Sequence, residues 1–257
     1  MPTLININCK PMKNILVISL ILNLMLLGFV GYSVFNKGGE LHIRSKAVAE
    51  TEQAQVQSQE QVQEQAFIPF PLWIGKTTLF EALPNTPGEI IFVGNSITDG
   101  CEWAELFNNP SVKNRGIGGD KIKGVLLRLP EIIESLPQKI FIQIGINDLA
   151  SQMNTSEISR TYQIIVDSIR SASPETRIYI QSVLPTEAYV KNDSVIILNE
   201  KIKKLADDNS LTFINLYDKF LDGNGSLDMQ LSYDGVHLNG KGYLVWKEAL
   251  ESYVNEP

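Results

Sequence analysis

The sequence is poor in the residues that most often mark a metal site, a disulfide scaffold or a nucleic-acid surface. Its 257 residues include only two cysteines and two histidines, and 22 lysines and arginines stand against 29 aspartates and glutamates. Cys9 and Cys101 lie in different regions, so they predict no disulfide framework and no cysteine-based zinc site. We interpret Cys101 as a small buried residue rather than a reactive thiol. The net charge of −7 argues against nucleic acid as a partner, because phosphate binding requires clustered basic side chains.

Long hydrophobic runs are equally scarce, and the stretch from 15 to 35 is the one that matches a membrane span. Its length fits the roughly 20 residues that a bilayer requires and exceeds the roughly 7 to 15 of a cleavable signal core. We therefore expect a short tail over 1–14 and a signal anchor over 15–35, in preference to a buried core helix. Basic residues lie on both sides of this stretch and do not set its orientation. A lone span ahead of one large domain predicts export of that domain to the periplasm or the cell surface.

Residues 36–66 differ in composition from the rest of the chain. This segment is rich in glutamine and glutamate, and from Thr51 onward it has almost no large apolar residues. Such a segment buries too little surface to offset the entropy of ordering, which predicts a flexible linker. A coiled coil is the alternative, but Val56 and Val62 are too sparse to form a heptad seam. From residue 67 to residue 257 the composition is that of a single globular domain.

Short apolar runs alternate with helical patterns throughout this domain. The runs that predict strands are Ile90 to Val93, Val112 to Asn114, Ile140 to Ile144, Arg177 to Val183 and Leu211 to Leu216. Between them, apolar residues recur at helical spacing; Asn154 and Glu157 precede one such helix as a predicted cap and its reciprocal partner. Alternation of this kind predicts an α/β fold with a parallel sheet and helices on both faces.

The end of the first predicted strand carries a candidate nucleophile. The run from Ile90 to Val93 stops at Gly94, and the chain then turns sharply toward a helical pattern at Asn95 and Ser96. Ligands of open α/β sheets bind at the carboxyl ends of the strands, where such a turn would present the Ser96 hydroxyl. Taken alone, such a turn is most often simply a helix cap.

The next two strand ends add groups that could stabilise negative charge. The second leads into the glycine-rich sequence NRGIGGD, residues 114–120, whose backbone N–H groups can approach a ligand closely. It lacks the ending of a P-loop and the spacing of a dinucleotide fingerprint. The third leads into GIND, residues 145–148, which places the Asn147 amide at the same edge.

Near the end of the chain, DGVH places Asp234 three residues before His237. The other histidine, His42, lies in the predicted linker, so His237 is the one imidazole that the domain can offer as a general base. A lone histidine is more often a core residue. An aspartate in the same turn, positioned to accept a hydrogen bond from the ring, favours a catalytic role instead.

The sequence DGNGSLD, residues 222–228, has the start of a calcium-binding loop. Its sixth position is Leu227 rather than glycine, and its twelfth is Tyr233 rather than glutamate. We interpret it as an ordinary surface turn. The sequence therefore predicts no metal site and no cofactor.

Taken together, GNSITDG, NRGIGGD, GIND and DGVHLN resemble the SGNH branch of the GDSL hydrolases. Within that branch the chain is similar to the acetylesterases akin to platelet-activating-factor acetylhydrolase and to proteins labelled sialate O-acetylesterase. The resemblance extends from about Leu79 to Tyr253. It implies a flavodoxin-like, three-layer α/β/α fold around a parallel sheet of about five strands, which would follow the N-terminal membrane span.

The resemblance also assigns roles. It implies that Ser96 is the nucleophile, that Asp234 and His237 complete a triad, and that Gly119 and Asn147 join the Ser96 backbone N–H as oxyanion donors. Asn95 departs from the commonest family motif, which has aspartate at this position.

These observations predict a serine esterase for short acyl esters. O-acetyl groups on carbohydrate are the first candidate substrate, since an anchored and exported domain would meet cell-surface or imported material. A lysophospholipase or a lipid esterase akin to platelet-activating-factor acetylhydrolase is the second candidate, and a non-catalytic glycan-binding module is the third.

Overall fold

The structure is a computed structural model that describes residues 67–188 and 190–256. The predicted tail, membrane anchor and linker, residues 1–14, 15–35 and 36–66, lie outside the described residues and stay predictions. Within the part of the chain that is described, no helix combines the length and the apolar character that crossing a bilayer requires.

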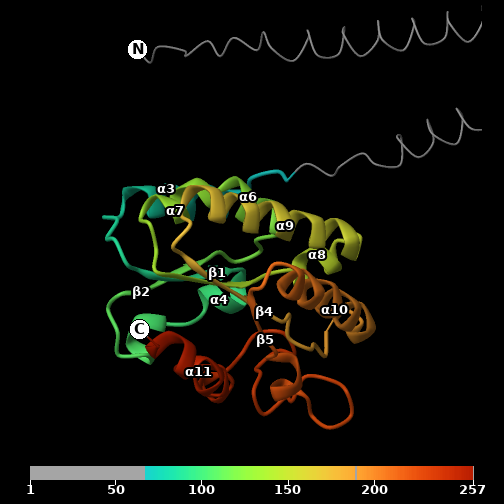
Figure 1. Cartoon of the computed structure of the whole chain (residues 1–257). Coiled ribbons are helices and arrows are strands. Elements are labelled where there is room, and N and C mark those ends of the chain that lie inside the picture. Colours follow the sequence, from blue (N-terminus) through green and yellow to red (C-terminus); the bar gives the residue numbers. More distant parts are fainter. Residues whose placement is uncertain (1–66, 189, 257) are drawn as a thin grey trace, which may run out of the picture. The chain divides into compact units, whose positions relative to one another are not determined.

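A five-stranded, all-parallel sheet forms the middle layer and confirms the predicted α/β fold (Figure 1). Its strands lie in the order β2-β1-β3-β4-β5. They are β1 (Ile90–Gly94), β2 (Val112–Gly116), β3 (Lys139–Gln143), β4 (Arg177–Gln181) and β5 (Thr212–Ile214). The sheet runs from β1 to β2 in one direction and from β1 to β3, β4 and β5 in the other. Such a switch in direction leaves a crevice at the carboxyl ends of β1 and β3, and ligands bind there in folds of this class.

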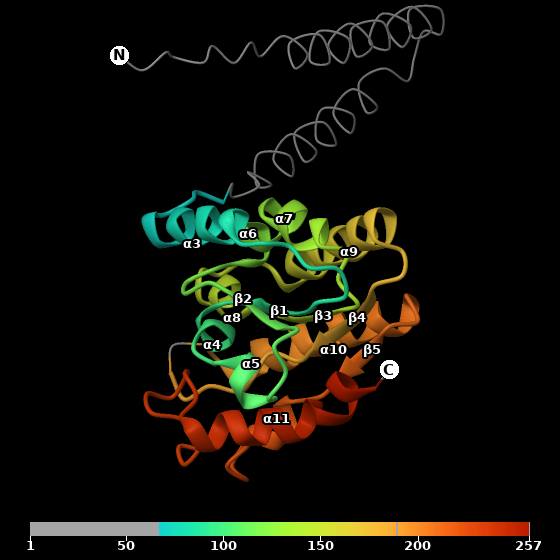
Figure 2. The same cartoon turned by 90° about the vertical axis from the view of Figure 1, so that its left-hand side faces the viewer.

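Helices cover both faces of the sheet, as the alternating pattern predicts. They are α3 (Pro71–Ala82), α4 (Ser96–Asp99), α5 (Trp103–Leu106), α6 (Ile122–Leu127), α7 (Leu129–Glu134), α8 (Ile146–Ala150), α9 (Thr155–Ala172), α10 (Asn192–Asp208), the 3-10 helix η1 (Tyr217–Phe220) and α11 (Gly240–Asn255). Figures 1 and 2 show α3, α6, α7 and α9 on one face and α11 on the other. The result is a three-layer arrangement.

Two predicted details differ from the structure. The last strand is shorter than the predicted run from 211 to 216, because the backbone N–H groups of Leu216 and Tyr217 donate to the Ser182 hydroxyl. Asn154 caps α9 through a 2.8 Å bond from the Ser156 N–H, as predicted. The side chain of Glu157, predicted to complete that cap, instead lies 2.7 Å from Nζ of Lys123.

Stacked aromatic rings join the sheet to the helices beneath it. The Phe92 ring of β1 stacks on Trp103 with centroids 4.3 Å apart and on Phe141 of β3 with centroids 4.8 Å apart. Trp246 of α11 meets Trp103 edge to face at 4.9 Å. Since such ring pairs add to the free energy gained by burial, they fix α5 and α11 against β1.

The end of β2 packs directly against α4. A Cβ atom at Gly116 would lie 2.2 Å from the backbone nitrogen of Asp99 and 2.6 Å from its Cα. No side chain fits between these two backbones, so glycine is required at this position. The contact sets how closely α4 can approach the sheet.

Replacing this glycine should therefore strain the protein. We expect Gly116→Ala to lower the free energy of unfolding by about 1–3 kcal/mol, because the methyl group must displace backbone rather than a side chain. Urea denaturation measures the change. Gly75→Ala is the control, because a Cβ at this position of α3 has nothing within 4 Å. It should leave stability equal or slightly higher, and equal stability of the two variants would contradict the close contact.

Candidate active site

Ser96 is the first residue of α4, directly after the carboxyl end of β1. Asn95 caps this helix, and its Oδ1 accepts a 3.0 Å hydrogen bond from the Ile97 N–H. The Asn95 side chain is fully buried. Aspartate and asparagine are similarly good cap residues. Asn95 thus makes the same backbone contact that an aspartate could make here.

The other end of α4 is held by side chains that sequence reasoning missed. Asn114, at the glycine-rich end of β2, donates from Nδ2 to the carbonyl oxygens of Thr98, Asp99 and Cys101 at 3.0, 3.0 and 2.8 Å. The hydroxyl of Tyr243 on α11 donates to the Ile97 carbonyl at 2.8 Å. These bonds satisfy carbonyl groups that the helix leaves unpaired. They hold Ser96 in place from two separate elements.

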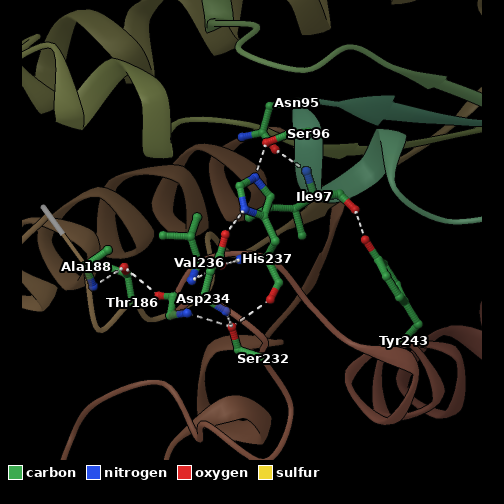
Figure 3. A network of polar contacts seen from close by, with 11 residues as sticks. Asn95, Ser96, Ile97, Thr186, Ala188, Ser232, Asp234, Val236, His237 and Tyr243 are labelled. Carbon is green, nitrogen blue, oxygen red and sulfur yellow. Dashed lines mark hydrogen bonds and ion pairs between the residues drawn. The ribbon is translucent and has the colours of Figure 1, made fainter.

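Ser96, His237 and Asp234 form a continuous hydrogen-bonded line (Figure 3). The Ser96 Oγ lies 2.8 Å from His237 Nε2, and His237 Nδ1 lies 2.6 Å from Asp234 Oδ2. Serine and histidine are separated by 141 positions in the sequence. The fold therefore brings the predicted pair of motifs together with each ring nitrogen facing the partner that a triad requires.

Asp234 is held as an acceptor by its own turn. Its Oδ1 accepts from the backbone N–H groups of Val236 and His237 at 3.0 and 2.7 Å. Partial burial acts to raise the pKa of Asp234, but the hydrogen bonds from the His237 ring and from these two backbone groups outweigh it and leave the pKa below its ordinary value. Asp234 is thus kept ionised beside the imidazole.

Ser232 and Thr186 close the turn that carries Asp234 and His237. The Ser232 hydroxyl donates to the His237 carbonyl at 2.6 Å and accepts from the Gly235 N–H at 2.9 Å. The Thr186 hydroxyl, in the loop after β4, donates to the Gly235 carbonyl at 3.0 Å. Thr186 carries no sequence signal, because the carbonyl that it contacts is 49 positions away in the chain. Ser232 lies in the same turn as the atoms it contacts and resembles an ordinary turn residue.

The glycine-rich loop after β2 lies against Ser96. A Cβ atom at Gly118 would lie 4.0 Å from the Ser96 Cβ, and Gly119 adopts a φ of +78° that favours glycine. Asn147, at the start of α8, donates from Nδ2 to the Asp120 carbonyl at 2.9 Å. The amide of asparagine carries two hydrogens, and this bond uses one of them. The structure therefore joins Asn147 to the loop that contains Gly119.

A buried ion pair anchors that loop. Asp120 and Arg128 are both buried, and Arg128 Nε lies 2.9 Å from Asp120 Oδ2. Burial raises the pKa of Asp120 above its ordinary value, and the adjacent guanidinium opposes this rise. Arg128 also donates to the carbonyl of Gly94 at 3.2 Å. The pair thereby ties the loop to the end of β1, although charges of this kind are costly to bury.

Asp148 connects the GIND turn to the same region. Both of its carboxylate oxygens lie 3.1 Å from the backbone nitrogen of Ile122, which begins α6. Burial raises the pKa of Asp148 to about 7, and the hydrogen bond from the Ile122 N–H only partly offsets this effect. The sequence singled out its neighbour Asn147 and gave no signal for this contact.

Cys101 is buried, as predicted. Burial, with a smaller contribution from the charge of Glu102, raises the pKa of the Cys101 thiol to about 12. The thiolate is the reactive form of cysteine, so this residue is unreactive near neutral pH.

Comparison with known proteins places this chain among ester hydrolases. Residues 92–245 match the sequence model of the GDSL-like lipase/acylhydrolase family. The platelet-activating factor acetylhydrolase IB subunit alpha2 of Rattus norvegicus is 28% identical over 167 residues, which cover 60% of this chain and 71% of that protein.

Two solved structures share the architecture. One is a Streptococcus pneumonia protein described as a candidate platelet activating factor, with a TM-score of 0.65 and 25% identity over 82% of this chain and 99% of that one. The other is an acetylxylan esterase from Geobacillus stearothermophilus, with a TM-score of 0.57 and 18% identity over 68% of this chain and 97% of that one. At 18% identity the second likeness shows the fold alone.

The chain belongs to the GDSL-like lipase/acylhydrolase family, as the resemblance of its motifs predicts. It is an ester hydrolase.

The raised pKa of Asp148 predicts a pH-dependent contribution to stability. An unfolded aspartate releases its proton near pH 3.9, whereas the folded protein retains it to about pH 7. Between these values the folded state binds more protons, so the contribution of Asp148 to stability falls as the pH rises. Asparagine does not titrate. We therefore expect Asp148→Asn to weaken the loss of stability between pH 5 and pH 8, measured by urea denaturation.

Asp167→Asn is the control, because Asp167 is exposed on α9. This variant should show the pH dependence of the parent protein. A parent-like pH dependence in Asp148→Asn as well would show that Asp148 does not titrate between these values.

Proposed function

We propose that the protein is a serine esterase that removes short acyl groups, above all acetyl groups, from O-acetylated carbohydrate. The observation that carries this proposal is the hydrogen-bonded line of Ser96, His237 and Asp234 at 2.8 and 2.6 Å. Family membership makes the protein an ester hydrolase. Ester hydrolysis by a serine enzyme needs a nucleophile and a base, and these three hydrogen-bonded side chains would supply them.

In the proposed mechanism, His237 Nε2 takes the proton of the Ser96 hydroxyl as the oxygen attacks the ester carbonyl. Asp234 accepts the hydrogen bond of the Nδ1–H and stabilises the imidazolium that forms. The imidazolium then donates its proton to the departing alcohol oxygen. Water, activated by the neutral imidazole, releases the acyl group from Ser96 by the same steps in reverse order. Each proton transfer in these reaction steps passes through the His237 imidazole.

Three neutral hydrogen-bond donors would stabilise the negative charge that develops on the carbonyl oxygen. They are the N–H groups of Ser96 and Gly119, and Nδ2 of Asn147. Ser96 is the first residue of α4, so the helix leaves its N–H unpaired. Fixed donors of this kind favour the transition state because they need no reorganisation when the charge develops.

Carbohydrate is the favoured alcohol portion of the substrate. Tyr233 stacks on the His237 ring with an angle of 13° between the ring planes, and the residue is 68% exposed. It offers an accessible aromatic surface next to the base, where the leaving alcohol must lie. The acetylxylan esterase with the same fold acts on an acetylated carbohydrate, as its name states.

A lipid ester is the second candidate substrate. The relatives that are 28% identical are named for platelet-activating factor acetylhydrolase activity. Exposed apolar side chains also lie along and beside α3, namely Ile68, Leu72, Ile74, Leu79 and Leu83. A non-catalytic glycan-binding module is the third candidate, and a fluorophosphonate probe separates it from an esterase because the probe labels only an activated serine.

The location of the enzyme is part of the proposal. An anchor over residues 15–35 and a linker over residues 36–66 would place the domain outside the cytoplasm, at the membrane. The catalytic domain would then meet esters of the cell surface or of imported polymers.

The nucleophile assignment and the substrate class can be tested in one screen. We expect the protein to release acetate from acetylated xylooligosaccharides faster than from an acetylated phospholipid. Ser96→Ala should abolish both reactions and labelling by the fluorophosphonate probe. Acetate release by a folded Ser96→Ala variant at the parent rate would rule out Ser96 as the nucleophile, and a preference for the phospholipid would favour the second candidate.

Asn147 should lower the barrier of the chemical step, in addition to any effect on substrate binding. Loss of one oxyanion donor costs about 3–4 kcal/mol of barrier, so Asn147→Ala should lower kcat by roughly 10² to 10³. Steady-state kinetics with p-nitrophenyl acetate measures this effect. Asn154→Ala, which removes only the cap of α9, is the control and should leave kcat unchanged. A normal kcat in Asn147→Ala would exclude this donor.

A further inference from the structure

The reaction geometry fixes where the acyl chain must lie, if the proposed function holds. The attacked carbon bonds to the Ser96 oxygen, the oxyanion, the leaving oxygen and the acyl chain. The leaving oxygen has to face His237, which returns the proton to it. The oxyanion has to face its donors. The acyl chain is then directed away from the imidazole. Gly118 of the glycine-rich loop lies next to Ser96, since a Cβ at Gly118 would be 4.0 Å from the Ser96 Cβ.

The start of α3 covers the loop on that side. A Cβ atom at Gly118 would lie 3.3 Å from Cδ2 of Leu72 and 4.0 Å from Cβ of Ser96. A Cβ atom at Gly119 would lie 3.3 Å from Cζ of Phe70. Leu72 therefore packs against Gly118, where a Cβ would also lie 3.9 Å from Oδ2 of Asp99, and Phe70 packs against Gly119.

The arrangement of the layers separates this region from His237. Figures 1 and 2 show α3 on the face of the sheet opposite to α11, and His237 lies in the loop that leads into α11. Ser96 lies between them, at the end of β1. An ester bound to Ser96 would have its alcohol on the His237 side and its acyl group on the α3 side.

Contacts along α3 hold Phe70 and Leu72 in place. Lys76 of α3 lies 2.6 Å from Asp99 Oδ1 at the end of α4. The Phe80 ring lies 4.9 Å from the Arg115 guanidinium. Because these two contacts attach α3 both to the helix that carries Ser96 and to β2, the wall and the nucleophile are held in fixed relation.

We propose that Phe70 and Leu72 form the end wall of the acyl subsite and restrict the enzyme to acetyl and similarly short acyl groups. Both residues precede residue 92, where the match to the family model begins. Acyl selectivity is thus assigned to a segment outside the part of the chain that carries the family motifs.

The chain-length profile of the full protein tests this assignment. We would measure kcat/KM for p-nitrophenyl acetate, butanoate and hexanoate. In Leu72→Ala the ratio of butanoate to acetate should rise about tenfold or more, since each methylene that a site rejects changes the rate by at least this factor. Leu79→Ala is the matched control: Leu79 is 52% exposed, Leu72 is 51% exposed, and both lie on α3. Its ratio should equal that of the parent.

Phe70→Ala should raise the same ratio, and Phe70→Leu provides a milder truncation if the first variant does not fold. The exposure of Leu72 makes Leu72→Ala the decisive variant. An unchanged or lowered ratio in Leu72→Ala, with acetate still hydrolysed, would overturn the assignment and leave the proposed function intact. A parent protein that hydrolyses none of the three esters would instead contradict the proposed function.

Discussion

The position of Ser96 depends on a helix that cannot sustain itself. Helix α4 is four residues long, and a helix of this length is unstable without tertiary contacts. Its start is fixed by the Asn95 side chain and its end by the Asn114 side chain. The direct backbone contact at Gly116 sets its distance from the sheet. The hydroxyl is therefore placed by the carboxyl ends of two neighbouring strands rather than by the helix that carries it.

The rest of the site is assembled around that hydroxyl by buried polar groups. Arg128 ties the Asp120 loop to the end of β1, and Asp148 ties the GIND turn to the start of α6. The bond from Arg128 to Gly94 joins residues 34 positions apart, and the bond from Ile122 to Asp148 joins residues 26 positions apart. Their burial is unfavourable for the charged forms, as the raised pKa values of both aspartates show. These contacts attach the loop and the GIND turn to neighbouring elements beside Ser96.

Much of the fold and of the site could be predicted because the signals are local. The strand runs, the glycine-rich loop and the Asp234–His237 pair each occupy a few consecutive residues, and a parallel sheet brings strand ends to one edge. The groups that sequence reasoning missed act at long range. Asn114, Asp148 and Thr186 each satisfy backbone atoms of another segment, and the same residue types serve as ordinary caps and turn formers elsewhere. Such contacts become visible only when the chain is folded.

The place of α3 has a consequence for how enzymes of this construction can diverge. The groups proposed to break the ester bond come from the ends of β1, β2 and β3 and from the loop before α11, whereas Leu72 lies in α3 and Phe70 directly precedes this helix. In this proposal, chemistry and acyl preference are encoded in separate stretches of the chain. Substitutions in α3 would then alter the range of acyl groups accepted while the strand ends keep the same catalytic groups.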